Sequence, residues 1–346
     1  MLGRALLGSL FGVATPALPL GSSACETPQK SMALAPFENY EYYVCMKKAV
    51  ITGGAGFIGS NLSHALVKAG WETHIVDINP SFRKDTLPKE ATLHVLDVRT
   101  TADIEKVFAG ADVVFHTAAV PRVPYSIEHP VETTDQNITG TVSVLTAAAR
   151  AKVRRVVYSS SGSAYGQQKT LPFVETMEAA PVHPYGLQKY VGELFAALWP
   201  TLYGIETVSL RYFNVYGQGM DPNGAYALAI GKFLLARTKG EPITIFGDGT
   251  VTRDFTHVRD VVAANMLAAE STKVGKGEVI NIGAGRNISI QTLAEMFGGE
   301  IKYGPPRIES HDALADNRKA KELLGWIPTI KVEDGIAELK REAGLS

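Results

Sequence analysis

A glycine-rich loop of seven residues constrains the fold of this chain more than any other feature. The loop, Gly53-Gly-Ala-Gly56-Phe-Ile-Gly59, follows a short β-rich run at 49–52 and precedes apolar residues at helical spacing over 60–69. A second predicted strand, over 73–76, ends in Asp77. The order of strand, glycine loop, helix, strand and acid predicts a βαβ unit, and therefore a parallel α/β sheet.

The spacing of this loop fits a dinucleotide-binding site. Gly53 allows the tight turn, Gly56 lets the backbone approach a pyrophosphate, and Gly59 lets the helix pack on the strand. The N–H groups and the positive dipole end of the helix then face the phosphates. Asp77 lies 18 residues after Gly59, near the spacing of a ribose-diol ligand, and its carboxylate would repel a 2′-phosphate. The sequence therefore predicts NAD rather than NADP; the alternative is a glycine turn in an unrelated α/β protein.

Strands and helices continue to alternate after this unit. We expect strands near 92–95, 112–116 and 155–160, and helices near 101–108 and 136–150, the second starting after Asp135. Repeated βα units predict a Rossmann-type, doubly wound parallel sheet with ligands at the carboxyl ends of its strands. Asp97 and Val98 follow the third strand, where the adenine edge would lie, and Ala118 and Ala119 follow the fourth, beside the crevice.

The length of the chain is sufficient for two domains. Residues 46–210 are expected to form the NAD-binding Rossmann domain. Residues 211–346 are expected to form mainly a smaller α/β substrate-binding domain that caps the crevice. No stretch of linker composition separates the two parts, so we expect them to be interleaved.

Composition excludes several classes of function. The formal net charge of -1 provides no basic field of the kind that drives nucleic-acid binding. Cys25 and Cys45 both precede Met46, so the main body can form no disulfide, cysteine zinc site or cysteine nucleophile. The eight histidines show no His-x3-His or His-Glu-x2-His spacing, and we expect no metal site.

The first 45 residues differ from the rest of the chain. Residues 5–20 are apolar, but Pro16 and Pro19 interrupt them, and the stretch is shorter than a membrane span of roughly 20 residues. Arg4 before this stretch is compatible with a weak secretory signal. We favour a disordered or non-native leader over 1–45, dispensable for folding and turnover, because Met46 opens directly into a strand. The protein is then expected in the cytoplasm, without a membrane partner.

Tyr185 and Lys189 lie one helical turn apart and therefore share a helix face. A nearby ammonium favours the phenolate and lowers the pKa of the tyrosine, which makes a base suited to removing a hydroxyl proton while hydride leaves for NAD. By themselves, a tyrosine and a lysine at this spacing are usually exposed on a helix surface. Because a complete dinucleotide fingerprint precedes them in this chain, they predict a catalytic site. The serines at the end of the fifth strand, 159–161, offer a hydroxyl to orient the substrate, or merely turn chemistry.

Together these motifs resemble those of the extended short-chain dehydrogenase/reductase superfamily, and specifically of its NAD-dependent nucleotide-sugar epimerases. The resemblance runs from Met46 to about Trp326. Its motifs are Thr52-Gly-Gly-Ala-Gly-Phe-Ile-Gly59, Ser159-Ser-Ser-Gly-Ser-Ala-Tyr-Gly166, Tyr185-Gly-Leu-Gln-Lys189, Arg211-Tyr-Phe-Asn-Val-Tyr-Gly217, the run from Gly247 to Asp260, and Asn281-Ile-Gly-Ala-Gly285. It implies a UDP-sugar substrate that passes through a 4-keto intermediate.

The resemblance assigns roles position by position. Tyr185 matches the catalytic base, and Lys189 matches its partner, which also binds the nicotinamide ribose. Ser161 matches the catalytic serine or threonine. The further cofactor contacts that it implies are Phe57, Ile58 and Tyr212.

Substrate contacts are implied in the C-terminal half. Asn214 resembles the residue that binds the nucleotide-sugar diphosphate, and Arg253 and Arg307 resemble the arginines that capture it. Arginines near a strand end suit bidentate phosphate binding. Thr244 and Phe246 resemble uridine-contacting positions.

Ala313 occupies a position that varies between bulky and small in relatives and gates the 2-substituent of the sugar. A small residue there leaves space for an N-acetyl group; the alternative is drift at a pocket wall. The run from Arg307 to Asp316 departs from many relatives, since it is one residue shorter and lacks a glycine. Glu309 is therefore the alternative ligand for the ribose diol.

Gly162 and Ser163 stand where related dehydratases and decarboxylases carry a carboxylate. Without it, elimination has no obvious proton carrier, which favours C4 epimerisation of UDP-GlcNAc/GalNAc, UDP-Glc/Gal or both. The alternatives are UDP-glucuronate 4-epimerase, a dehydratase or a decarboxylase, and a non-catalytic NAD-binding protein. Apolar helix faces near 136–150 and 185–199 predict a homodimer as in relatives, or burial within one subunit.

Overall fold

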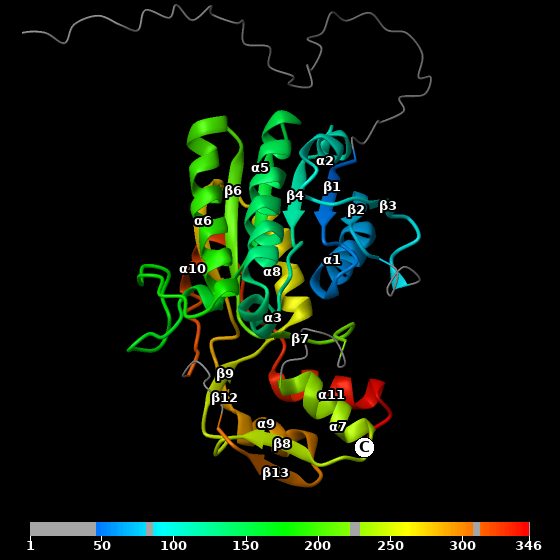
Figure 1. Ribbon diagram of the computed structural model, residues 1–346. Coiled ribbons are helices and arrows are strands. Elements are labelled where there is room, and N and C mark those ends of the chain that lie inside the picture. Colours follow the sequence, from blue (N-terminus) through cyan, green and yellow to red (C-terminus); the bar gives the residue numbers. More distant parts are fainter. Residues whose placement is uncertain (1–45, 81–85, 222–228, 307–311, 346) are drawn as a thin grey trace, which may run out of the picture. The chain divides into compact units, whose positions relative to one another are not determined.

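Seven parallel strands form the central sheet of this computed structural model (Figure 1). They are β1 (Lys48–Thr52), β2 (Glu72–Asp77), β3 (Thr92–Val95), β4 (Val113–His116), β5 (Arg155–Ser161), β6 (Glu206–Tyr212) and β11 (Lys276–Ile282). Their order is β11-β6-β5-β4-β1-β2-β3. The chain winds outward from β1 in one direction and then crosses to β4 on the other side. The predicted Rossmann-type doubly wound sheet is confirmed, with its topological switch point between β1 and β4.

The structure describes residues 46–80, 86–221, 229–306 and 312–345. The predicted leader, 1–45, and the candidate diphosphate ligand Arg307 with Glu309 lie outside these residues.

Helices cover both faces of the sheet. One face carries α1 (Phe57–Lys68), α8 (Val258–Glu270) and α10 (Arg318–Leu324), and the other carries α2 (Thr101–Phe108), α5 (Gly140–Arg150) and α6 (Pro184–Tyr203). Strand side chains alternate between the faces: Ile51 packs with Leu62 and Val261, whereas Val50 packs with Val144. This double burial explains why the strands read as continuous apolar runs rather than as alternating ones.

The helix expected at 136–150 begins earlier than predicted. Helical structure starts at Pro130 and runs through α4 (Pro130–Thr134), a π-helical turn over Asp135–Thr139, and α5. Proline is favoured in the first turn of a helix, where its missing N–H costs nothing. The wide turn contains Asn137, whose side chain accepts from the N–H of Val120 (2.7 Å) and donates to its carbonyl (3.2 Å). The π-helical turn thus contains a side chain that is bonded to a residue 17 positions earlier, and no local pattern signals this contact.

A smaller group of elements follows β6. It contains β7 (Val215–Tyr216), β8 (Ile243–Phe246), β9 (Thr252–Asp254), β10 (Thr256–His257), β12 (Asn287–Ser289), β13 (Ile301–Gly304), α7 (Ala229–Thr238), α9 (Ile290–Phe297) and α11 (Val332–Glu342). A separate apolar core joins these elements, with Phe233, Phe297 and Ile336 buried in it. The expected boundary at 210/211 falls inside β6, and α8, β11 and α10 return to the main sheet.

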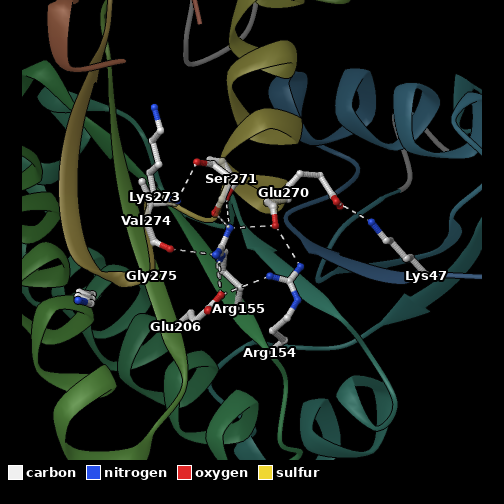
Figure 2. Close-up of polar contacts among 12 residues, drawn as sticks. Lys47, Arg154, Arg155, Glu206, Glu270, Ser271, Lys273, Val274 and Gly275 are labelled. Carbon is white, nitrogen blue, oxygen red and sulfur yellow. Dashed lines mark hydrogen bonds and ion pairs between the residues drawn. The ribbon is translucent and has the colours of Figure 1, made fainter. Parts of the chain in front are cut away.

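Arg155, at the start of β5, ties this sheet to the end of α8 (Figure 2). It is only 2% exposed, and its Nη1 donates to the carbonyls of Ala268 (2.6 Å), Ala269 (3.0 Å) and Ser271 (2.9 Å). Its Nε donates to Glu206 (2.8 Å). A cation at the C-terminus of a helix satisfies the free carbonyls and complements the dipole. One side chain thereby holds β5, β6 and α8 in register at the edge of the sheet formed by the strands' N-termini.

Replacing Arg155 with Leu should lower the free energy of unfolding by about 3 kcal/mol, because several desolvated acceptors lose their donor. The midpoint of thermal unfolding should fall by roughly 5–10 °C. The matched control is Arg154→Leu, since Arg154 also bonds to Glu206 and Ala269 but is 41% exposed. That variant should lose at most about 1 kcal/mol. Equal losses in the two variants would contradict the capping role of Arg155.

Candidate active site

A cavity of about 330 Å³ opens at the carboxyl ends of the central strands. Every residue predicted to contact the cofactor lines it, and so does the predicted catalytic serine: Gly53, Gly56, Phe57, Ile58, Gly59, Asp77, Asp97, Val98, Ala118, Ala119, Ser161, Tyr185, Lys189 and Tyr212. These residues come from the ends of six strands and from the first turns of α1 and α6, which are distant in the sequence. The parallel sheet therefore brings the glycine loop and the Tyr-x3-Lys pair to one cavity.

The glycine loop has the geometry of a phosphate cradle. Gly53 has a φ of +68°, and a Cβ there would lie 2.6 Å from the backbone of Ala118. A Cβ on Gly59 would lie 2.4 Å from the carbonyl oxygen of Gly53. Gly56 begins α1 without a side-chain cap, so the helix presents its first N–H groups toward the cavity. These residues fit a dinucleotide pyrophosphate.

Two carboxylates border the same cavity. Asp77 accepts hydrogen bonds from the N–H of Ala55 (3.0 Å) and of Asn79 (3.0 Å), which fixes it against the glycine loop. Asp97 is clamped by Arg99, whose Nε donates to both carboxylate oxygens at 3.1 and 3.0 Å. These hydrogen bonds lower the pKa of Asp97. The Asp77 carboxylate is suited to accept from ribose hydroxyl groups and disfavours an added phosphate, whereas Asp97 is ion-paired with Arg99.

Tyr185 and Lys189 lie in the first two turns of α6, and both side chains are buried. The Lys189 Nζ donates to the carbonyl of Ser159 (2.7 Å) and lies 5.1 Å from the ring centroid of Tyr158. Burial lowers the pKa of Lys189 to about 7, and the negative charge of Glu193 opposes that shift. The ammonium is thus held beside the cavity by a strand carbonyl.

The three serines at the end of β5 have different partners. Ser159 Oγ lies 3.1 Å from Tyr212 Oη, and Ser160 donates to Glu193. Ser161 Oγ instead accepts the N–H of Ser163 (3.1 Å), so its own proton is available to a further acceptor. This arrangement favours Ser161 over its neighbours as the substrate-facing hydroxyl.

Sequence reasoning missed a buried ion pair directly behind the cavity. Glu193 continues the face of Tyr185 and Lys189 by one more helical turn, and it receives Arg211 Nε at 2.8 Å and Nη2 at 2.6 Å. Both side chains are at most 4% exposed. Arg211 also lies over the ring of Tyr165, 4.4 Å from its centroid. The sequence did contain a signal for this pair, namely a lone glutamate within a predicted helix. Only the apolar face of that helix was interpreted.

Of the predicted substrate residues that the structure describes, Ser161 lines the cofactor cavity, whereas the others, Asn214, Thr244, Phe246, Arg253 and Ala313, are not among its lining residues. Asn214 has a positive φ of 33°, and its Nδ2 donates to the carbonyl of Asp254 (2.9 Å). Asp254 directly follows Arg253, and the N–H of Ala313 donates to Thr252 (3.2 Å). The structure therefore gathers Asn214, Arg253 and Ala313 around β9.

Thr244 and Phe246 belong to β8, which pairs with β13. Both are exposed on one face of β8 in the smaller core, and Phe246 is 38% exposed. Their predicted contact with uridine remains a prediction.

Asp254 is a second residue that sequence reasoning missed. It is fully buried and accepts the N–H groups of Ala284 (2.8 Å), Gly285 (3.0 Å) and Ala315 (3.0 Å). Burial raises its pKa to about 6, against the effect of these three bonds. One carboxylate thus joins β9 to two loops, at 284–285 and at 315, beside Arg253. Asp254 belongs to the motif from Gly247 to Asp260, but its hydrogen-bond partners lie 30 to 61 residues away, so the motif does not reveal them.

The described part of the chain contains neither a candidate metal site nor a helix that could span a membrane. No group of three or more His, Cys, Asp or Glu side chains there could hold a metal ion. Within the same residues, no helix is both long and apolar enough to cross a membrane.

Comparison with known proteins identifies the class. Residues 49–283 match the NAD dependent epimerase/dehydratase family. The UDP-glucose 4-epimerase of Lactobacillus helveticus is 34% identical over 313 residues, covering 84% of this chain and 95% of that protein. The chain therefore matches this family in sequence over most of its length.

Two solved structures of UDP-sugar epimerases are also similar to this chain. UDP-glucose 4-epimerase of Thermotoga maritima, solved with UDP-glucose, has a TM-score of 0.81 and 35% identity, over 86% of this chain and 98% of that one. UDP-N-acetylglucosamine 4-epimerase of Methanobrevibacter ruminantium, in complex with UDP-N-acetylmuramic acid, has a TM-score of 0.81 and 33% identity. The match covers 86% of this chain and 97% of that one.

The chain belongs to the NAD-dependent epimerase/dehydratase family. The predicted resemblance to nucleotide-sugar epimerases of the extended short-chain dehydrogenase/reductase superfamily is confirmed, and so is NAD as the cofactor of this class.

Proposed function

We propose that this protein is an isomerase that interconverts UDP-hexoses at C4, acting on UDP-GlcNAc and UDP-GalNAc, on UDP-Glc and UDP-Gal, or on both pairs. The observation that carries the proposal is the convergence of Ser161, Tyr185 and Lys189 with the glycine loop on one cavity. NAD and sugar nucleotides occur together in the cytoplasm, which is where we place the protein.

The proposed chemistry needs few groups. Tyr185 takes the proton of the C4 hydroxyl, Ser161 orients that hydroxyl, and the Lys189 ammonium stabilises the phenolate. The glycine loop and Asp77 would hold NAD, which would supply the hydride acceptor and donor for C4 on either side of a 4-ketone. Because the hydride would be returned to the sugar, turnover is expected to consume no cofactor.

The diphosphate is proposed to lie against β9. Arg253 is the middle residue of this strand, and Asn214 is hydrogen-bonded to its last residue, Asp254. The guanidinium of Arg253 suits bidentate binding of a phosphate. Phe213 links this region to the catalytic end of β5, since a Cβ on Gly162 would lie 3.1 Å from its ring. Ala313 packs against the cluster that contains Phe213, which supports its role beside the sugar.

Replacing Ala313 with Tyr should therefore discriminate against N-acetylated substrates. Overpacking a site costs about 1–3 kcal/mol, so turnover of UDP-GlcNAc should fall roughly 5- to 150-fold relative to that of UDP-Glc. The measurement is kcat/KM on both substrates for the two proteins. An equal loss on both substrates, or a wild-type protein inactive on UDP-GlcNAc, would refute the gate.

We further propose a homodimer formed through α5 and α6. Leu187, Leu194, Leu198 and Leu202 form one stripe along α6, and each is between 48% and 60% exposed. α6, which carries this stripe, lies beside α5 on the face of the sheet that α8 does not cover (Figure 1). A second copy of the chain would cover it.

Introducing Glu at both Leu194 and Leu198 should convert the dimer to a monomer. Charges buried in an apolar contact cost several kcal/mol, so the dimer Kd should rise at least about 100-fold. Sedimentation at micromolar concentration measures the change. Leu267→Glu, at a 38% exposed position on α8, is the control and should remain dimeric. A monomeric wild-type protein would overturn the proposal.

The function is tested by incubating purified protein with a panel of UDP-sugars and separating the products, without added cofactor. The expected products are C4 epimers of the supplied UDP-hexoses. A 4-keto-6-deoxy product would indicate a dehydratase and a pentose product would indicate a decarboxylase. Turnover of UDP-glucuronate alone to its epimer would indicate a different substrate for the same reaction.

A further inference from the structure

His183 is the N-cap of α6. Its backbone is extended (φ -150°, ψ 159°), and its Nδ1 accepts the N–H of Gly186 at 3.0 Å. This position is usually filled by Ser, Thr, Asn or Asp, whose oxygens accept the free N–H groups of the first turn. Unlike the neutral caps, an imidazole changes charge between pH 5 and 8, and its protonation removes the accepting lone pair.

The turn that His183 caps carries Tyr185. The two rings lie nearly parallel, with centroids 6.3 Å apart and planes 17° apart. The N–H of Tyr185 donates to the buried Ser126 of α3 (Val123–Glu128) at 3.2 Å. The next residue, Gly186, has no free space, since a Cβ there would lie 2.6 Å from the carbonyl oxygen of Ser163. A shift of the cap is therefore transmitted to Tyr185 rather than absorbed.

We propose that His183 is a positioning residue for Tyr185, and that it holds the first turn of α6 only while Nδ1 is unprotonated. The proposal rests on the proposed role of Tyr185 as the base. A protonated imidazole would direct a second N–H at the N–H of Gly186. It would also add a positive charge at the positive end of the helix dipole. Both effects loosen the turn.

Other titratable groups lie near His183, including Lys189, whose pKa burial lowers to about 7, and they are common to the wild-type protein and its His183 variants. Tyr185 on α6 is the titratable group stacked on it, and Lys189 lies one turn further along the helix. The short helix η3 (Gly162–Ala164) brings the carbonyl of Ser163, and α3 brings the hydroxyl of Ser126. Burial is the largest effect and lowers the pKa of His183 from 6.5, while a hydrogen bond to its own backbone opposes the shift.

The sign of the pH effect follows from that direction. With a folded pKa below that of the unfolded chain, the folded state binds fewer protons and the cap is complete at neutral pH. As the pH falls below 6.5 and through the folded pKa, the cap is lost. Activity should therefore decline on the acid side.

The test compares His183→Ala and His183→Asn with the wild-type protein, all loaded with NAD, by kcat and KM for the UDP-sugar from pH 5 to 9. At pH 8, His183→Ala should lose roughly 5- to 30-fold in kcat, which corresponds to about 1–2 kcal/mol, with little change in KM. His183→Asn keeps an accepting oxygen without titration. It should retain kcat within about 3-fold, and its kcat at pH 5 relative to pH 8 should exceed that of the wild type by at least about 2-fold.

The matched control is His129→Asn. His129 is the residue before α4 and is exposed, and its side chain makes no cap hydrogen bond, so its replacement should leave the pH profile unchanged. Wild-type kcat in His183→Ala, or a wild-type acid limb in His183→Asn, would overturn the proposal. The pH profile of His183→Asn tests the proposal even if His183→Ala fails to fold.

Thermal unfolding of the same proteins at pH 8 separates this proposal from the proposed function. The unfolding midpoint should fall in His183→Ala and be restored in His183→Asn whether or not the protein acts on UDP-sugars. A midpoint unchanged in His183→Ala would refute the cap. A wild-type protein inactive on every UDP-sugar would refute the function and leave the result on the cap intact.

Discussion

Replacing Tyr185 with Phe is expected to reduce kcat for the UDP-sugar at least about 100-fold, the lower end of the effect of general acid–base catalysis. The substitution removes only the phenolic hydroxyl. The ring, its stacking on His183 and the backbone hydrogen bond to Ser126 all remain. NAD should therefore stay bound at the wild-type stoichiometry, because the glycine loop and Asp77 are unaffected.

Two measurements check this prediction. Product separation gives kcat, and NAD(H) released on denaturation gives the cofactor content. Tyr125→Phe is the matched control, because its hydroxyl bonds to the exposed Glu132 and the residue is outside the cavity lining. That variant should retain kcat within about 2-fold. A Tyr185→Phe protein with a near wild-type rate would refute the assignment of the base.

The second large effect is expected at the buried ion pair. Glu193→Ala should lower the free energy of unfolding by about 3–5 kcal/mol, because it leaves the guanidinium of Arg211 buried without its carboxylate. Arg211 already has one buried N–H group, at Nη1, without a hydrogen-bond partner among the described residues. Loss of the two bonds from Nε and Nη2 would leave the whole charge uncompensated.

Denaturant unfolding measures this loss, and a double variant identifies its cause. Glu193→Leu combined with Arg211→Met replaces the pair by apolar side chains of similar size and should recover most of the stability. Asp103→Ala, in the exposed pair with Lys106, should cost less than about 1 kcal/mol. A double variant as unstable as Glu193→Ala would show that the loss arises from packing rather than from an unpaired charge.

Local patterns in the sequence were sufficient for the cofactor half of the site. Gly53, Gly59 and Asp77 belong to one continuous βαβ unit, whose geometry follows from short-range spacing, and all three line the cavity. The pair Tyr185 and Lys189 is likewise set by one helical turn. Such features depend on residues that are neighbours along the chain, so the sequence alone determines them.

Tertiary structure alone decided what surrounds these groups. Glu193 meets Arg211 from another element, Arg155 reaches carbonyls 113 to 116 residues away, and Asp254 binds two distant loops. The π-helical turn at Asn137 and the return of α8 and β11 to the main sheet are of the same kind. Each is a contact between distant segments, fixed by how the sheet is ordered and covered. No spacing within a segment encodes that order, because a buried charge or amide finds its partner only after the strands have assembled.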